Sequence, residues 1–150
     1  MTSPVYSPQD PMIGPIIHAI ANIIRNQIPS VGYVYEQPPD GPPEDNTALI
    51  PLTQYKILDD TNGKLSVKLT FGLRHLIRRG SYPDNILTAY SYFMPYMQAF
   101  AAWNNQTLNG LVRSISPSNG GVAQFVEAGQ VFVVLIINLD VLTEFNIPTY

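Results

Sequence analysis

The chain has 150 residues, of which 45% are hydrophobic and only 13% are charged. This length favours a single domain with its own core, while the charged share is about half of that usual in soluble proteins. The net charge of -3 argues against a general nucleic-acid-binding protein, and the absence of cysteine excludes disulfides and thiolate chemistry in this sequence.

The low charge has two interpretations. Partner proteins cover much of the surface, because depletion of charge is typical of interface cores. Alternatively, the abundant Asn, Gln, Ser and Thr residues supply solubility. We favour the first interpretation, which predicts an oligomer.

The start of the chain predicts an arm over residues 1–10, followed by one domain over residues 11–150. The first residues have no basic region and no apolar core, so they do not resemble a signal peptide. The most apolar run, residues 131–137, is too short to span a bilayer. We therefore expect a protein without membrane contact that is made in the cytoplasm.

A helix is predicted at the start of the domain. Asp10 and Pro11 are typical of an N-cap and a first helical position, and Pro29 ends the pattern. His18 falls on the polar side. The apolar side is formed by isoleucines at three- and four-residue steps, the spacing of one helix face: Ile13, Ile16, Ile17, Ile20, Ile24 and Ile28.

Two strands and a loop are predicted next. Residues 31–36 predict a short strand. The proline-rich residues 37–46 predict an exposed loop with polyproline character, because proline removes backbone donors. Residues 47–59 predict a second strand, in which Pro51 marks an edge or a bulge.

The clearest pattern is the strand over residues 64–79, which follows a turn at residues 60–63 and alternates apolar and polar side chains. Fully extended, it measures about 50 Å, whereas a compact domain of this size is roughly 38 Å across. The hairpin tip at Asp59–Lys64 is therefore expected to protrude and to be covered by, or paired with, a neighbour. The alternative is a bulge near Gly72 that bends the strand around the core.

A central helix is predicted after residue 81. Ser81 and Asp84 resemble a capping box. Pro95 interrupts the helical pattern, which predicts a kink or two consecutive helices. The predicted core stripe of this helix has five members: Ile86, Tyr90, Phe93, Met97 and Phe100.

The last third of the chain is predicted to be strand. Residues 108–116 form a strand, residues 117–121 a hairpin connection, and residues 122–126 continue as strand. The last strand covers residues 130–145. Its first half is apolar at both parities, which indicates a central position with both faces covered.

These elements predict an α+β fold with the order α-β-β-β-α-β-β. It is a single domain with a mainly antiparallel β-sheet, an N-terminal helix and a central helix packed on it, and a long protruding β-hairpin.

The sequence contains no arrangement typical of catalysis or metal binding. His18 and His75 are far apart, with no carboxylate at ligand spacing, and each is interpreted as a surface or hydrogen-bonded structural histidine. The carboxylate pairs at residues 44–45 and 59–60 fall in predicted loops or turns, where they serve solvation and turn formation and nothing prepares them for acid–base catalysis. We therefore predict a protein that is not an enzyme and that has no metal or cofactor.

The charges are unevenly distributed. Six of the eight basic residues fall between Lys56 and Arg79, while residues 1–46 hold one basic and five acidic residues. This favours contacts between acidic and basic patches of neighbouring copies, with a solvated strand face or contact with DNA phosphates as alternatives. Tyr92 and Tyr96 fall off the apolar stripe and are further candidates. The candidate interface residues are Asp59, Asp60, Asn62, Lys64, Lys68, Arg74, Arg78, Arg79, Tyr92 and Tyr96.

The pattern as a whole resembles the tail terminator family of bacteriophages, which includes the minor tail protein U-like proteins. The resemblance covers about residues 11–146 and rests on the order of elements and the length. Its features are the helix ending in Ile28-Pro29, the segment 31–35, the hairpin ending in residues 71–79, the helix start at 82–84, and the segments 105–112 and 136–141.

The resemblance implies a homo-oligomer, a hexameric ring around the DNA channel. Such a ring caps the tail tube protein, stops its polymerisation and presents a surface to the neck or connector proteins of the head. DNA passes through the lumen without sequence-specific binding, and the protein is part of the virion, assembled in the host cytoplasm. The hairpin tip and the loop at residues 37–46 are the candidates for docking on adjacent rings.

Two alternatives remain open at this point. One is a head-completion or neck connector protein, a stopper or adaptor ring with twelve-fold symmetry. The other is an unrelated small-ligand-binding α+β protein that uses an aromatic cleft along the central helix.

Overall fold

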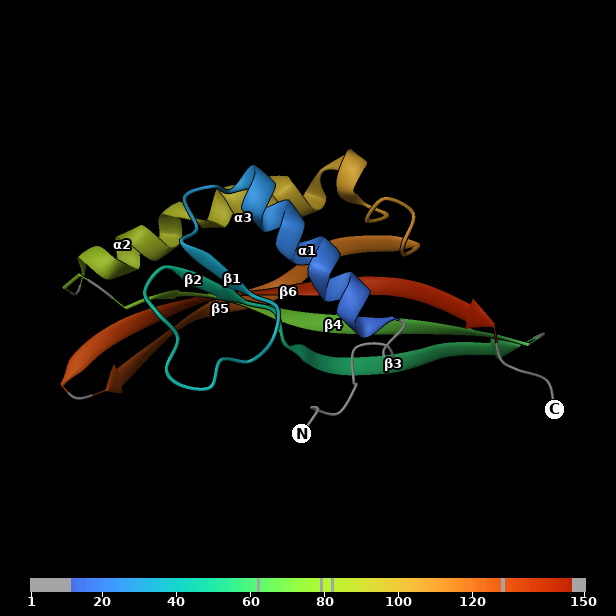
Figure 1. Cartoon of the computed structure of the whole chain (residues 1–150), viewed down its shortest axis with the longest axis horizontal. Helices are drawn as coiled ribbons and strands as arrows, with labels where there is room; N and C mark the ends of the chain where they lie inside the picture. The colour runs from blue at the N-terminus through green and yellow to red at the C-terminus, as the bar shows by residue number, and fades with distance from the viewer. Residues whose placement is uncertain (1–11, 62, 79, 82, 128, 147–150) are drawn as a thin grey trace, which may run out of the picture.

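A layer of helices covers one face of a six-stranded sheet (Figure 1). In this computed structural model, the structure describes residues 12–146 except 62, 79, 82 and 128. The helices are α1 (Ile13–Gln27), α2 (Asp84–Ser91) and α3 (Phe93–Ala101), followed by a short 3-10 helix, η2 (Trp103–Asn105). The strands are β1 (Tyr33–Tyr35), β2 (Thr47–Leu49), β3 (Leu52–Thr61), β4 (Lys64–Ile77), β5 (Ser114–Glu127) and β6 (Gln130–Asn146).

The predicted α+β class and the mainly antiparallel sheet are confirmed. The strand order is β1-β2-β4-β6-β5, and β3 pairs with β4 beside β2. Only the β1–β2 pairing is parallel among the described strands. Four strands and not three lie between α1 and α2, because the strand predicted over residues 47–59 is interrupted at Pro51. Its carbonyl still accepts a hydrogen bond from the Gly72 amide at 2.9 Å, so β2 and β3 follow the same edge of β4.

Strand β4 pairs with β6 along its whole length, from Lys64 opposite Asn146 to Ile77 opposite Val133. Odd-numbered β4 residues such as Phe71 and Leu73 are fully buried under the helices. Even-numbered residues therefore lie on the other face, because successive side chains of a strand point to opposite sides. A hairpin turn precedes β4, where Gly63 adopts a φ of 74°, but the turn is shorter than the predicted 60–63 because β3 runs to Thr61.

Helix α1 confirms the predicted isoleucine face, because Ile16, Ile20 and Ile24 are fully buried. The helix ends at Gln27, just before Pro29. Met12 occupies the N-cap position. The predicted cap at Asp10 and Pro11 and the predicted arm at residues 1–10 lie outside the described residues.

The central helical segment is two consecutive helices, one of the two predicted outcomes. Pro95 lies in the first turn of α3, where a backbone N–H has no partner within the helix and its loss costs little. The predicted capping box at Ser81 is wrong. Pro83 is the N-cap of α2 and no side-chain cap bond is made, although the Ser81 carbonyl accepts the Asn85 amide at 3.1 Å.

The hairpin connection predicted at residues 117–121 is also wrong. Strand β5 runs through this segment, and its register against β6 shifts between Pro117 and Gly120. The shift is a bulge, held by Asn138, whose amide nitrogen donates to Asn119 Oδ1 at 2.8 Å. The residues predicted as strand before it, 108–113, form turns, and the true hairpin joins β5 to β6.

Candidate functional site

The main candidate surface is a three-stranded extension of the sheet, here called the β-arm: residues 52–61 of β3, 64–70 of β4 and 140–146 of β6. Figure 1 shows it reaching past the helical layer. The predicted hairpin tip lies at its end. The arm is broader than the predicted hairpin, because β6 accompanies β4 as a third strand.

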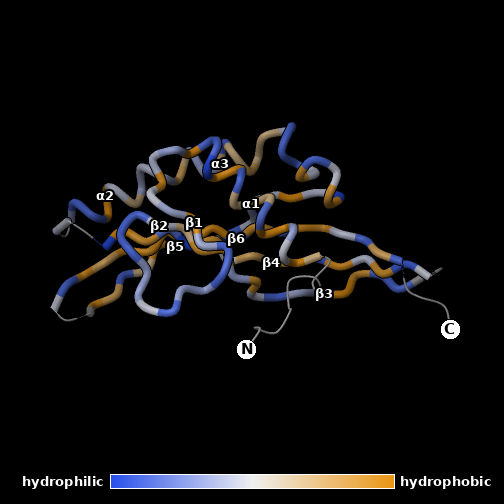
Figure 2. The backbone as a smooth tube through the Cα atoms, in the orientation of Figure 1, coloured by the Kyte–Doolittle hydropathy of each residue, from blue (hydrophilic) through white to orange (hydrophobic). Residues whose placement is uncertain are grey.

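Strand β3 forms the open edge of the β-arm and is exposed along residues 52–60 on both faces. Tyr55 and Ile57 are 66% and 53% exposed, although their neighbours on β4, Leu69 and Val67, are buried. Figure 2 shows hydrophobic segments along the strands of this arm. Apolar side chains on an open edge strand are typical of a surface that another chain covers.

The predicted basic residues are divided between the arm and the body. Lys64 and Lys68 lie on the helix-free face of the arm, and Lys64 Nζ lies 3.5 Å from Glu144 Oε1. Arg74 lies on the same face of β4, closer to the body. The guanidinium carbon of Arg78 lies 4.8 Å from the ring centroid of Phe132, which indicates a cation–π contact.

Asp59 and Asp60 lie near the end of β3, where they pair with Ser66 and Leu65. They therefore point to opposite faces of the arm. Asn62 and Arg79 lie outside the described residues. The structure thus brings Asp59, Asp60, Lys64 and Lys68 onto the arm, and it leaves Arg74 and Arg78 outside it.

Tyr92 and Tyr96 are not surface residues, so their prediction as interface candidates is wrong. Tyr96 is fully buried and Tyr92 is 9% exposed, whereas Tyr90 is 54% exposed. The stripe that faces the sheet is Ala89, Tyr92, Tyr96, Ala99 and Phe100. The sequence pattern was ambiguous because apolar and aromatic residues occur on every side of this segment.

The outward side of α2 and α3 is a second candidate surface that the sequence reasoning missed. Leu87 and Met94 are 61% and 56% exposed there, and Trp103, just beyond α3, is 86% exposed. Residues 85–112 contain no charged side chain, a signal that was visible in the sequence. Aromatic residues and Met without charge are typical of the core of a protein interface.

His75 lies in a buried polar cluster between the sheet and the helices. Its Nδ1 lies 2.6 Å from the Tyr96 hydroxyl oxygen and its Nε2 lies 2.9 Å from Asn46 Oδ1. These partners define a neutral imidazole, in which Nε2–H donates to Asn46 and Nδ1 accepts from Tyr96. Burial lowers the pKa of His75 to about 4, and the nearby Asp45 carboxylate only partly opposes this.

The same cluster fixes the strand that follows the proline-rich loop. Asn46 adopts a φ of 56°, and its amide nitrogen donates to the Ser30 carbonyl at 2.7 Å. The Tyr92 hydroxyl donates to the same carbonyl at 3.1 Å, and its ring stacks on His75 with centroids 4.0 Å apart. Burial raises the pKa of Tyr96, so its hydroxyl remains a donor. The cluster therefore holds loop, sheet and helices together.

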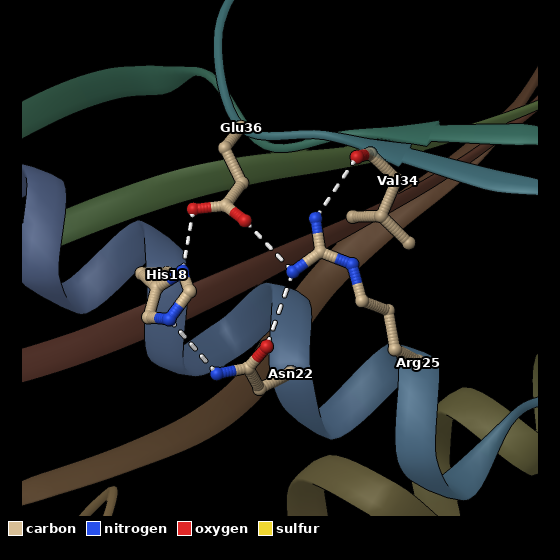
Figure 3. Close-up of polar contacts among 5 residues, drawn as sticks. All are labelled: His18, Asn22, Arg25, Val34 and Glu36. Atoms are coloured by element: carbon tan, nitrogen blue, oxygen red, sulfur yellow. Dashed lines mark hydrogen bonds and ion pairs between the residues drawn. The ribbon is translucent and has the colours of Figure 1, made fainter.

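Figure 3 shows a second polar cluster, which joins α1 to β1 near the start of the loop. His18 Nδ1 lies 2.8 Å from Glu36 Oε1, and Arg25 Nη1 lies 2.7 Å from Glu36 Oε2. Arg25 Nη2 donates to the Val34 carbonyl at 3.3 Å. Partial desolvation tends to raise the pKa of Glu36, but the hydrogen bonds from His18 and Arg25 outweigh it and the pKa is lowered. These contacts make the predicted polar side of α1 a support for the loop.

Within the described part of the chain, no group of three or more His, Cys, Asp or Glu side chains is placed to hold a metal ion. None of the described helices has the length and apolar character needed to cross a membrane. Comparison with family models finds no match to this chain, and comparison with curated proteins finds no significant match. The surfaces themselves therefore carry the functional argument.

Proposed function

We propose that this protein is the subunit of a homo-oligomeric ring at the head-proximal end of a bacteriophage tail. The ring ends polymerisation of the tail tube protein and joins the tail to the neck of the head. The protein is not an enzyme and acts through its shape as a structural part of the virion. The observation that carries this proposal is the β-arm, whose edge strand β3 exposes apolar side chains on a projection of the sheet.

A ring fits the arrangement of these surfaces. A closed ring uses two different patches of each subunit, one for each neighbour. The β-arm lies at one end of the molecule, and α2 and the proline-rich loop lie toward the other (Figure 1). Contacts at both ends of one chain build a closed ring or an open filament, depending on the rotation between copies.

Termination requires that the two faces of the ring differ. One face must match the last ring of the tail tube, while the other must not recruit another tube subunit. The sheet supports such a difference, because its helix-covered face and its helix-free face present different side chains. The tip of the β-arm is the segment that we assign to docking on the adjacent ring.

The decisive experiment is the mass of the purified chain in solution, measured by mass photometry, with negative-stain images of the particles. A hexameric ring has six times the 16.6 kDa of one chain. A twelve-fold ring favours the head-completion or neck connector alternative. A monodisperse monomer at high micromolar concentration contradicts both.

The small-ligand alternative has weaker support. The apolar hollow beside α3 has a volume of about 260 Å³ and is lined by Phe93, Met97 and Leu135 among others. Ligand sites generally measure about 300–1,000 Å³. Tyr92 and Tyr96, two of the aromatic residues of the central helical segment, pack around His75 and not around this hollow.

A further inference from the structure

We infer that Lys56 and Lys68 on the β-arm of one copy contact Asp40 and Glu44 in the proline-rich loop of the next copy. This inference rests on the proposed ring and specifies its subunit contact. The partner is a second copy of this chain.

The two lysines lie directly opposite each other in the β3–β4 pairing, on the helix-free face. Like charges at opposite positions of neighbouring strands repel and destabilise the pair. Neither Lys56 nor Lys68 makes an ion pair with a described residue, whereas nearby Lys64 has Glu144 as its partner. An acidic partner from outside the chain relieves this repulsion.

The proline-rich loop carries exposed side chains of the opposite charge. Asp40 and Glu44 are exposed, and neither makes an ion pair with a described residue. The nearest described cation on α1, Arg25, is taken by Glu36 at 2.7 Å. Figure 2 shows this loop as a hydrophilic segment beside the sheet.

The loop is held in place at its end, which favours a specific contact. Thr47 Oγ1 donates to the Glu44 carbonyl at 2.9 Å, and the Arg78 amide donates to Asp45 Oδ1 at 2.6 Å. The prolines at 38, 39, 42 and 43 restrict the backbone further. Less conformational entropy is therefore lost when a partner binds.

The two patches are placed for a head-to-tail contact and not for a contact within one chain. The β-arm lies at one end of the long axis, and the loop is displaced toward the other end (Figure 1). A second copy set end to end brings its loop toward the arm of the first. Such a contact between two different patches is the kind from which rings are built.

The contact is expected to be made by side chains and not by strand addition to β3. Pro51 precedes β3, Lys56 lies in its middle, and its register against β4 shifts twice. Prolines, lysines and bulges at an edge are the features that prevent another strand from pairing there. The lysines then serve both to protect the edge and to bind the loop.

The test is a charge reversal with a charge swap, in the full chain. Lys56→Glu with Lys68→Glu, and separately Asp40→Lys with Glu44→Lys, each place like charges across the contact. Each pair should raise the concentration needed for half assembly by at least about tenfold. The four changes together should restore assembly to near the wild-type value, at the wild-type net charge. Lys56→Gln with Lys68→Gln should give a smaller loss.

Mass photometry measures the assembly, and circular dichroism verifies that each variant is folded. The reversed lysine pair keeps like charges on β3 and β4, so the fold of one subunit should be unaffected. The two reversals change the net charge in opposite directions, so a loss in both cannot come from bulk charge.

Three outcomes overturn the inference. If rings persist in both reversed variants, as expected when the lysines face DNA or solvent, this contact is ruled out. The proposed ring is left intact by that result. The contact is also ruled out if the variant with all four changes does not regain assembly. A wild-type chain that forms no ring removes the proposed function and the inference with it.

Discussion

His75 Nδ1 lies 2.6 Å from the Tyr96 hydroxyl oxygen, so a hydrogen bond inside the core joins strand β4 to helix α3. Both side chains are fully buried. The bond explains why a strand residue at an inward position is polar, since the imidazole finds partners on both ring nitrogens. Its main consequence is for stability, because a buried polar group without a partner is costly.

Stability should fall as the pH is lowered, because His75 stays neutral in the folded protein. Its pKa is about 4 when folded and 6.5 when unfolded. Between these values the unfolded chain binds a proton that the folded chain does not. The free energy of unfolding therefore decreases as the pH is lowered. We expect a loss of about 2 kcal/mol between about pH 7.5 and about pH 5 from this group.

Urea denaturation at several pH values measures this loss. His75→Gln should be less stable at neutral pH and should lose most of the dependence above about pH 5. The control His18→Gln, at the exposed histidine, should keep the pH dependence of the wild-type protein. An equally steep dependence in His75→Gln would assign the effect to other groups.

Tyr96→Phe should destabilise the fold by about 1–3 kcal/mol, because it leaves the buried Nδ1 of His75 without a donor. The matched control is Tyr90→Phe, at a tyrosine that is 54% exposed. It should change the free energy of unfolding by less than about 0.5 kcal/mol. Equal stabilities of the two variants would mean that the Tyr96–His75 bond contributes nothing.

Gly120→Ala should be strongly destabilising, while Gly121→Ala should not. A Cβ atom at Gly120 would lie 1.9 Å from the Ile136 carbonyl oxygen, so the backbone of β5 or β6 must shift. A Cβ atom at Gly121 meets nothing within 4 Å. We expect a cost of about 1–3 kcal/mol for the first change and less than about 0.5 kcal/mol for the second. Thermal melts of both variants measure the difference, and similar melting temperatures would refute the close approach at the bulge.

Deleting residues 59–64 tests the docking role of the β-arm tip. The deletion removes only Lys64 from the β4–β6 pairing and no residue of the buried core, so the domain should fold. On the proposed function, particles made with the shortened chain should have tails of uncontrolled length or tails that do not join heads, as seen by electron microscopy. Normal virions from this deletion, with the chain present in them, would refute the docking role.

The sequence by itself determined the elements whose pattern is local. The isoleucine spacing predicted α1, the alternation after Lys64 predicted β4, and Gly63 marked the turn between β3 and β4. Pro95 predicted the division between α2 and α3. For α1 and β4 the periodicity is enough, because the same face is buried along the whole segment. At Gly63 and Pro95 the backbone preference of the residue itself is enough.

Only the tertiary structure decided which residues of the aromatic segment are buried and where strand β5 is continuous. Apolar and aromatic residues occur on every side of the segment that forms α2 and α3, so the position of β4 and β6 selects Tyr92 and Tyr96 for the core. Residues 117–121 have the composition of a turn, but pairing with β6 holds them in one strand as a bulge. The partners of His75 come from segments far apart in the sequence, Asn46 and Tyr96, and no local pattern encodes a contact between them.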